Sequence, residues 1–114
     1  MNIASTMDYK PRDLMVWLHD IDVNGLSDAD ANRVAEYNID DDDDLNRLVR
    51  EWLKPRYAEF NEASQTAMRA VLSKSKQWSV KEMEPVFAEI AFPSGQEIKD
   101  IERFMAALRK EILG

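Results

Sequence analysis

The sequence predicts an all-α fold: a single-domain antiparallel helical bundle of five to six helices. Apolar residues recur at three- and four-residue spacing, no stretch alternates with the period of a strand, and helix-opening Ser-x-x-acidic patterns recur along the chain. The 114 residues, of which 45% are hydrophobic, suffice for one core. Short connections of about two to five residues favour antiparallel neighbours.

The first helix is predicted over residues 11–22, after an arm formed by residues 1–10. Pro11 suits the first turn of a helix, where the missing N–H costs little. The spacing of the following apolar residues puts them on one face of this helix: Leu14, Met15, Trp17, Leu18 and Ile21. Gly25 is predicted to end the segment, because glycine tolerates the left-handed backbone that closes helices.

The five consecutive aspartates Asp40–Asp44 lead directly into the next core-facing helix, predicted over residues 45–54. Asp41 or Asp42 would cap this helix, and the aspartates that follow would meet the positive end of the helix dipole. Capping needs one or two carboxylates, so two or three of the five are expected to have no structural reason.

The remaining helices are predicted over residues 28–37, 56–74, 80–91 and 95–113. Ser27, Ser79 and Ser94 each precede an acidic residue three positions on and are predicted to cap the first, third and fourth of these. Pro55 is expected to break or kink the chain before the second. The last helix has the clearest apolar stripe, formed by Ile98, Ile101, Met105, Leu108 and Ile112.

The negative charge is confined to one region of the chain. Residues 1–44 hold 12 acidic against 3 basic residues, net −9, and residues 45–114 hold 10 against 12, net +2. Such a field repels phosphate backbones and attracts a basic protein, so we expect a basic partner and no direct nucleic-acid binding. The predicted partner-binding residues are the carboxylates Asp20, Asp22, Asp28, Asp30, Glu36, Asp40, Asp41, Asp42, Asp43 and Asp44, with Tyr37 or an exposed tryptophan as an apolar anchor.

The sequence offers no catalytic apparatus. The absence of cysteine excludes disulfides, thiolate zinc sites and cysteine nucleophiles. His19 is the only histidine, which excludes multi-histidine metal sites, and three glycines leave no glycine-rich phosphate cradle. We therefore expect no enzyme activity, no catalytic residue and no cofactor.

The segment Asp20-Ile21-Asp22-Val23-Asn24-Gly25 resembles the opening of an EF-hand calcium loop, in which oxygens at alternate positions converge on the ion. Asp28 would fit the ninth position of that loop. The twelfth position falls on Ala31, which cannot supply the bidentate carboxylate that the loop requires. A helix C-cap followed by an N-cap is therefore favoured, and no metal site is predicted.

The N-terminus has neither a basic n-region nor an apolar h-region, and no run approaches the roughly 18 apolar residues of a membrane span. We therefore expect a soluble, cytoplasmic protein without a membrane partner. The predicted stripe of the last helix spans two heptads, so a monomer or a weak homodimer is expected.

A small, acidic, cysteine-free helical chain without catalytic groups is typical of stoichiometric inhibitors. Immunity proteins and antitoxins against basic nuclease toxins match it in physical type, although not in sequence. Our hypothesis is an inhibitor whose carboxylates occupy the phosphate-binding cations of such a toxin. The alternatives are a structural or adaptor subunit that oligomerises through residues 95–113, and a phage-type nucleic-acid-mimic regulator.

Overall fold

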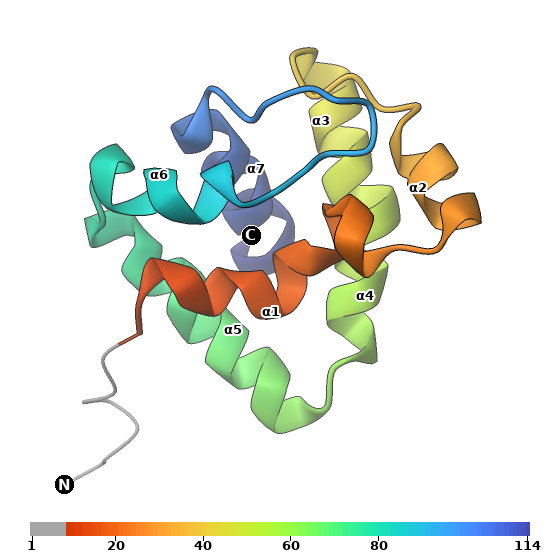
Figure 1. The fold of residues 1–114 in the computed structure, drawn as a ribbon. Helices are drawn as coiled ribbons and strands as arrows, with labels where there is room; N and C mark the ends of the chain where they lie inside the picture. The colour runs from red at the N-terminus through yellow and green to blue at the C-terminus, as the bar shows by residue number, and fades with distance from the viewer. Residues whose placement is uncertain (1–8) are drawn as a thin grey trace, which may run out of the picture.

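The computed structural model describes residues 9–114, and 73% of these residues are helical with no strand among them, which confirms the all-α helical bundle (Figure 1). The arm predicted over residues 1–10 lies outside the described residues as far as residue 8. The elements are η2 (Pro11–Leu14), α1 (Met15–Leu18), η3 (His19–Ile21), η4 (Val23–Gly25), α2 (Asp28–Val34), α3 (Asp42–Leu48), η5 (Val49–Leu53), α4 (Lys54–Glu59), α5 (Glu62–Lys74), η6 (Ser75–Gln77), α6 (Val80–Ala88) and α7 (Ile101–Leu113).

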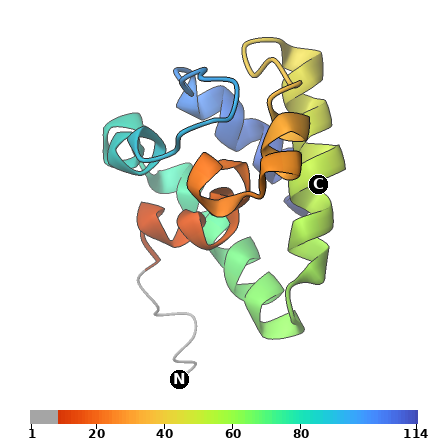
Figure 2. The ribbon, with the colours of Figure 1, turned by 45° about the vertical axis from the view of Figure 1, so that its right-hand side comes forward.

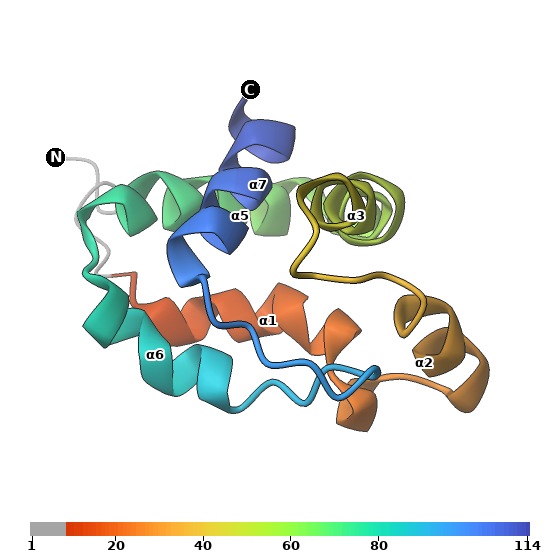
Figure 3. The same ribbon diagram turned by 90° about the horizontal axis from the view of Figure 1, so that it is seen from above.

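The segments α3, η5 and α4 form one continuous column, which stands upright in Figure 1 and is seen end-on in Figure 3. The η2–α1 segment crosses the molecule beside α5, and α6 lies on its other side (Figures 1 and 3). Helix α2 lies along the flank of the column (Figure 2), where the guanidinium of Arg33 is 5.5 Å from the ring centroid of Trp52. The helices among residues 9–114 are all too short or too polar to span a bilayer.

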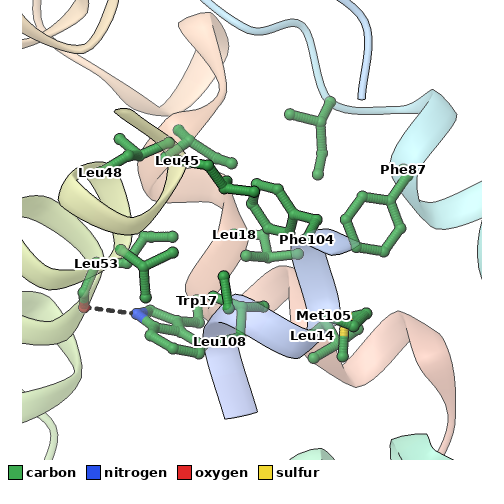
Figure 4. Close-up of a cluster of buried hydrophobic side chains, with 14 of the residues drawn as sticks. Leu14, Trp17, Leu18, Leu45, Leu48, Leu53, Phe87, Phe104, Met105 and Leu108 are labelled. Atoms are coloured by element: carbon green, nitrogen blue, oxygen red, sulfur yellow. Dashed lines mark hydrogen bonds between the residues drawn. The ribbon is translucent and has the colours of Figure 1, made fainter. Parts of the chain in front are cut away.

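Helix α7 supplies the centre of the hydrophobic core (Figure 4). Its apolar stripe is buried, with Ile101, Phe104, Met105, Leu108 and Ile112 each at most 7% exposed. The rings of Phe104 and Phe87 meet edge to face at 5.5 Å between centroids. The stripe is therefore covered by the chain's own helices.

Two buried tryptophans tie the η2–α1–η3 segment to the α3–η5–α4 column. The indole Nε1 of Trp17 donates to the Leu53 carbonyl at 2.9 Å (Figure 4), and the indole of Trp52 donates to the Asp20 carbonyl at 2.8 Å. A buried indole N–H needs such a partner, so each ring both fills the core and fixes the position of the other segment. Trp78 is only half-buried, against the edge of the core.

Of the break or kink predicted at Pro55, no break forms, because the column continues through this residue. The preceding turn is π-helical, and the N–H of Lys54 bonds to the carbonyl of Val49, five residues back. This wider turn relieves the clash between a proline ring and the preceding turn. The predicted helix over residues 56–74 is instead divided at Phe60, whose backbone is extended, and Asn61 caps α5 by accepting from the N–H of Ser64 at 2.8 Å.

Two of the three predicted serine caps are confirmed. Ser27 caps α2, and Ser79 caps α6 in a reciprocal box with Glu82. Ser94 caps no helix, because residues 95–100 cross towards the start of α3 and α7 begins only at Ile101, where Asp100 accepts from the N–H of Arg103 at 3.1 Å.

Gly25 is required for a reason other than the predicted one. Its backbone does not adopt the left-handed conformation, which among the described glycines is limited to Gly95 and Gly114. Instead Gly25 closes a short turn against η3, where a Cβ would lie 2.4 Å from the carbonyl oxygen of His19. No side chain larger than hydrogen fits at this distance.

The Gly25→Ala substitution is expected to lower the free energy of unfolding by about 1–3 kcal/mol, because the added Cβ must displace the backbone of η3. Urea denaturation followed by circular dichroism measures this loss. The additional change His19→Ala should not restore stability, since the contacted atom is the His19 carbonyl oxygen. Restored stability in the double variant would show that the imidazole causes the clash.

Candidate partner-binding surface

The aspartate run Asp40–Asp44 lies at the start of α3, and one of its members caps this helix. Asp41 is the N-cap and accepts from the N–H of Asp44 at 3.0 Å. The carboxylate of Asp44 accepts from the N–H of Asn38 at 2.9 Å and lies 3.6 Å from Arg47. The prediction that Asp41 or Asp42 caps this helix is therefore confirmed for Asp41.

Side chains from the C-terminal third of the chain hold the rest of the run in place. The guanidinium of Arg103 donates to the carbonyls of Ile39 and Asp40 and pairs with Asp42 at 3.1 Å. Gln96 donates from Nε2 to the carboxylate of Asp40 at 3.2 Å. These contacts join the run to α7 and to the segment before it, and they fix the direction of the Asp40 and Asp42 carboxylates.

The expectation that two or three of the five aspartates have no structural reason is therefore wrong. Within residues 9–114, Asp43 is the one member of the run whose carboxylate has no polar partner. Even so, Asp40, Asp41, Asp42 and Asp43 are all exposed, and the side chain of Asp42 remains 75% exposed while paired. The structural contacts orient the carboxylates of Asp40, Asp41 and Asp42 without removing them from solvent.

The fold adds two further carboxylates to the run. Glu97 and Asp100 line the same small cavity of about 60 Å³ as Asp40, and both are exposed. We call Asp40, Asp41, Asp42, Asp43, Glu97 and Asp100 the acidic end. Its six carboxylates face two cations, Lys99 and Arg103, which gives a local net charge of −4. Sequence reasoning missed Glu97 and Asp100, because nothing local to them indicates that residues 95–100 return to α3.

The other predicted carboxylates do not form one face with the acidic end. Asp28 and Asp30 lie in the first turn of α2, at the end of that helix away from the acidic end, and only Glu36 lies on the intervening loop. Arg33 and Arg47 line a pocket with Glu36 in that interval. Two guanidiniums therefore interrupt the predicted surface.

Asp20 and Asp22 are positioned for structure. Asp22 is only 8% exposed and accepts from the N–H of Asn24 at 3.1 Å as the N-cap of η4. Asp20 is half-buried, and this burial raises the pKa of its carboxyl group, while the nearby charges of His19 and Arg56 act in the opposite direction. The predicted surface must therefore be redrawn without Asp22, which cannot reach a partner.

Tyr37, the predicted apolar anchor, is half-buried, and its hydroxyl donates to Glu51 at 2.8 Å. Arg47 lies 5.6 Å from the centroid of its ring. Burial, and then the hydrogen bond with Glu51, raise the pKa of Tyr37; hydrogen bonds from Tyr37 and Arg47 lower the pKa of Glu51. The tyrosine is thus held within a polar cluster of its own chain.

In the segment that resembles a calcium loop, the helix end lies at Asp22, which also caps η4, and not at Gly25 as predicted; the predicted N-cap that follows is Ser27. Asp22 also accepts from the side-chain amide of Asn24, so its carboxylate is turned into its own loop. Among residues 9–114, no three acidic or histidine side chains converge as metal ligands would. His19 is exposed, with Nδ1 3.1 Å from the Met15 carbonyl oxygen.

Searches of protein-family models, of curated proteins and of solved structures found no match to this chain.

Proposed function

We propose that this chain is a stoichiometric inhibitor that docks its acidic end on a basic protein partner, as an immunity protein or antitoxin does with a nuclease-type toxin. The observation that carries this proposal is that Asp40, the first residue of the exposed run Asp40–Asp43, lines one cavity with Glu97 and Asp100, which lie far away in the chain and are also exposed. The cytoplasmic location expected from the sequence belongs to the same proposal.

The order of the acidic end supports a role in binding. Arg103 on α7 and Gln96 in the segment before α7 hold the run in place through contacts with its backbone and side chains. Loop ordering is one of the costs of association, and a surface that is already ordered avoids it. Like charges held close together also destabilise the free protein slightly, and an opposing cationic surface removes that cost.

The inhibitory mechanism follows from the partner's chemistry. A nuclease binds phosphate groups with exposed Lys and Arg side chains. Carboxylates of the acidic end would pair with these cations and occlude the surface that receives RNA or DNA. Because the attraction is electrostatic, association should be fast and should slow as salt is added.

The Asp43→Lys substitution is expected to slow association with the basic nuclease partner, to be sought among the products of neighbouring genes, by roughly 3- to 10-fold at low salt. Asp43 is suited to this test because its carboxylate has no polar partner within residues 9–114, so reversal breaks no contact there. Stopped-flow association at about 50 and 500 mM salt measures the effect, and inhibition of nucleic-acid hydrolysis at an equimolar ratio checks the stoichiometry.

Asp28→Lys provides the matched control, because Asp28 is exposed in the first turn of α2, away from the acidic end, and its reversal changes the net charge equally. This control should leave the association rate within about twofold. Equal rates and equal salt dependence for wild type and Asp43→Lys would overturn the acidic end as the docking surface. Slowing by both variants would show that only net charge matters.

A further inference from the structure

A second surface lies between the η2–α1 segment and α5, on helices that take no part in the acidic end. These helices run side by side (Figures 1 and 3) and leave a groove of about 430 Å³. Its apolar lining consists of Tyr9, Val16, Phe60, Ala67, Met68 and Val71. Its volume is in the range of sites that take several apolar groups.

The groove has a buried floor and an exposed apolar rim. Met68 and Val71 form the floor and are 4% and 2% exposed. Val16 stands on the rim at 61% exposed, the most exposed large hydrophobic residue of the described chain. Binding is favourable when a partner's apolar side chains exclude water from such an apolar rim and floor.

The charges around the groove favour a cationic occupant. Asp13 is the one charged residue of its lining, and Glu59 and Glu62 flank Phe60 at one end of the groove. Two cations on the same helices are held by contacts outside the groove: Arg12 pairs with Glu89 at 2.9 Å, and Arg69 donates to the Ile112 carbonyl at 2.9 Å. Lys10, next to Tyr9, is the exposed cation at the opposite end.

The net charge of the chain disfavours a second copy as occupant. Each copy carries a net charge of −7, so two copies repel each other as they approach. Repulsion of this kind opposes self-association. A groove between two helices is also the shape that receives the apolar face of a third helix.

We infer that this groove binds a cationic amphipathic helix of another protein, with the apolar face against Met68 and Val71 and the basic residues towards Asp13, Glu59 and Glu62. The site is independent of the proposed inhibitory function. It gives the chain a second docking surface whose recognition combines apolar contact with charge.

The test uses a synthetic amphipathic peptide of about 14 residues, built from Leu on one helical face and Lys on the other. Binding to the full chain is measured by fluorescence anisotropy, and the methyl NMR signals of Val16, Met68 and Val71 locate the peptide. A peptide with Ala in place of Leu, and one with Glu in place of Lys, should each bind at least about tenfold more weakly.

Val16→Asn should weaken binding of the Leu/Lys peptide about tenfold, because it removes the exposed apolar rim. Val23→Asn is the matched control, since Val23 is the other exposed large hydrophobic residue, at 40%, and lies outside the groove. This control and Asp43→Lys should each leave the peptide affinity within about twofold of the wild-type value. The proposals for the groove and for the acidic end are therefore tested independently.

Three results would overturn the inference. Equal binding of the Ala/Lys peptide, or no effect of Val16→Asn, would show that the peptide binds by charge elsewhere. A dimer seen by light scattering and lost in Val16→Asn would make a second copy the occupant. A gain in peptide affinity of about tenfold on changing Ile3 and Met7 to Asn in the full chain would make residues 1–8 the occupant.

Discussion

Replacing Trp17 by alanine is expected to lower the free energy of unfolding by about 3–5 kcal/mol. The side chain is fully buried, and its ring packs 5.9 Å from the ring of Tyr57. Its removal leaves a cavity at the junction of α1 with the α3–η5–α4 column and deprives the buried Leu53 carbonyl of the indole donor. Urea denaturation followed by circular dichroism measures the change without depending on the lost fluorophore.

Two companion variants separate the contributions of packing and hydrogen bonding. Trp17→Phe retains a ring and removes the donor, so we expect a loss of about 1–3 kcal/mol. Val16→Ala, at the exposed neighbouring position, should change stability by no more than about 0.5 kcal/mol. A loss below about 1 kcal/mol for Trp17→Ala would show that this ring does not hold α1 to the column.

The elements that were predicted from the sequence are those fixed by local chemistry. Ser79 and Glu82 form their reciprocal cap within four residues, and Ser27 caps α2 by accepting from the N–H of Asp30. The apolar spacing of α7 likewise identified its buried face, because helical periodicity depends only on neighbouring turns. The start of α5 could also have been found, since Asn61 is a favoured N-cap residue.

The elements that were missed depend on contacts between distant parts of the chain. Arg103 reaches Asp42 and the Ile39 carbonyl across about 60 residues, and Gln96 reaches Asp40 across a similar separation. These contacts draw residues 95–100 away from the predicted helix and over the start of α3. No spacing within either segment indicates the other, so the boundary at Ile101 and the full extent of the acidic end needed the fold.

Counting charges along the sequence predicted an acidic region. It could not separate the carboxylates that have structural contacts from those that are free to meet a partner. The net −9 of residues 1–44 includes Asp22, which is buried as a cap, and Asp44, which serves Asn38 and Arg47. It excludes Glu97 and Asp100, which the fold brings beside Asp40. The surface that supports the proposed function therefore contains fewer residues from the first third of the chain than predicted. It also contains two residues from the last third, Glu97 and Asp100.

Phe104→Ala is expected to lower the free energy of unfolding by about 3–5 kcal/mol and to leave the oligomeric state unchanged. Phe104 is 1% exposed in the stripe of α7, edge to face with Phe87, so its loss opens a cavity in the centre of the core. Chemical denaturation measures the stability, and light scattering at several protein concentrations measures the mass. Ala106→Ser, at an exposed position of the same helix, is the control and should cost no more than about 0.5 kcal/mol.

This pair of measurements separates a core helix from an association seam. If the chain were an adaptor that oligomerised through the stripe of α7, Phe104→Ala would dissociate the oligomer, and the mass measured by light scattering would fall. Each folded monomer would keep most of its stability. The structure places the same stripe against α5 and α6 within one chain, so the loss should appear in unfolding at every protein concentration. A concentration-dependent unfolding midpoint that disappears in Phe104→Ala would contradict this, because only a coupled assembly makes stability depend on concentration.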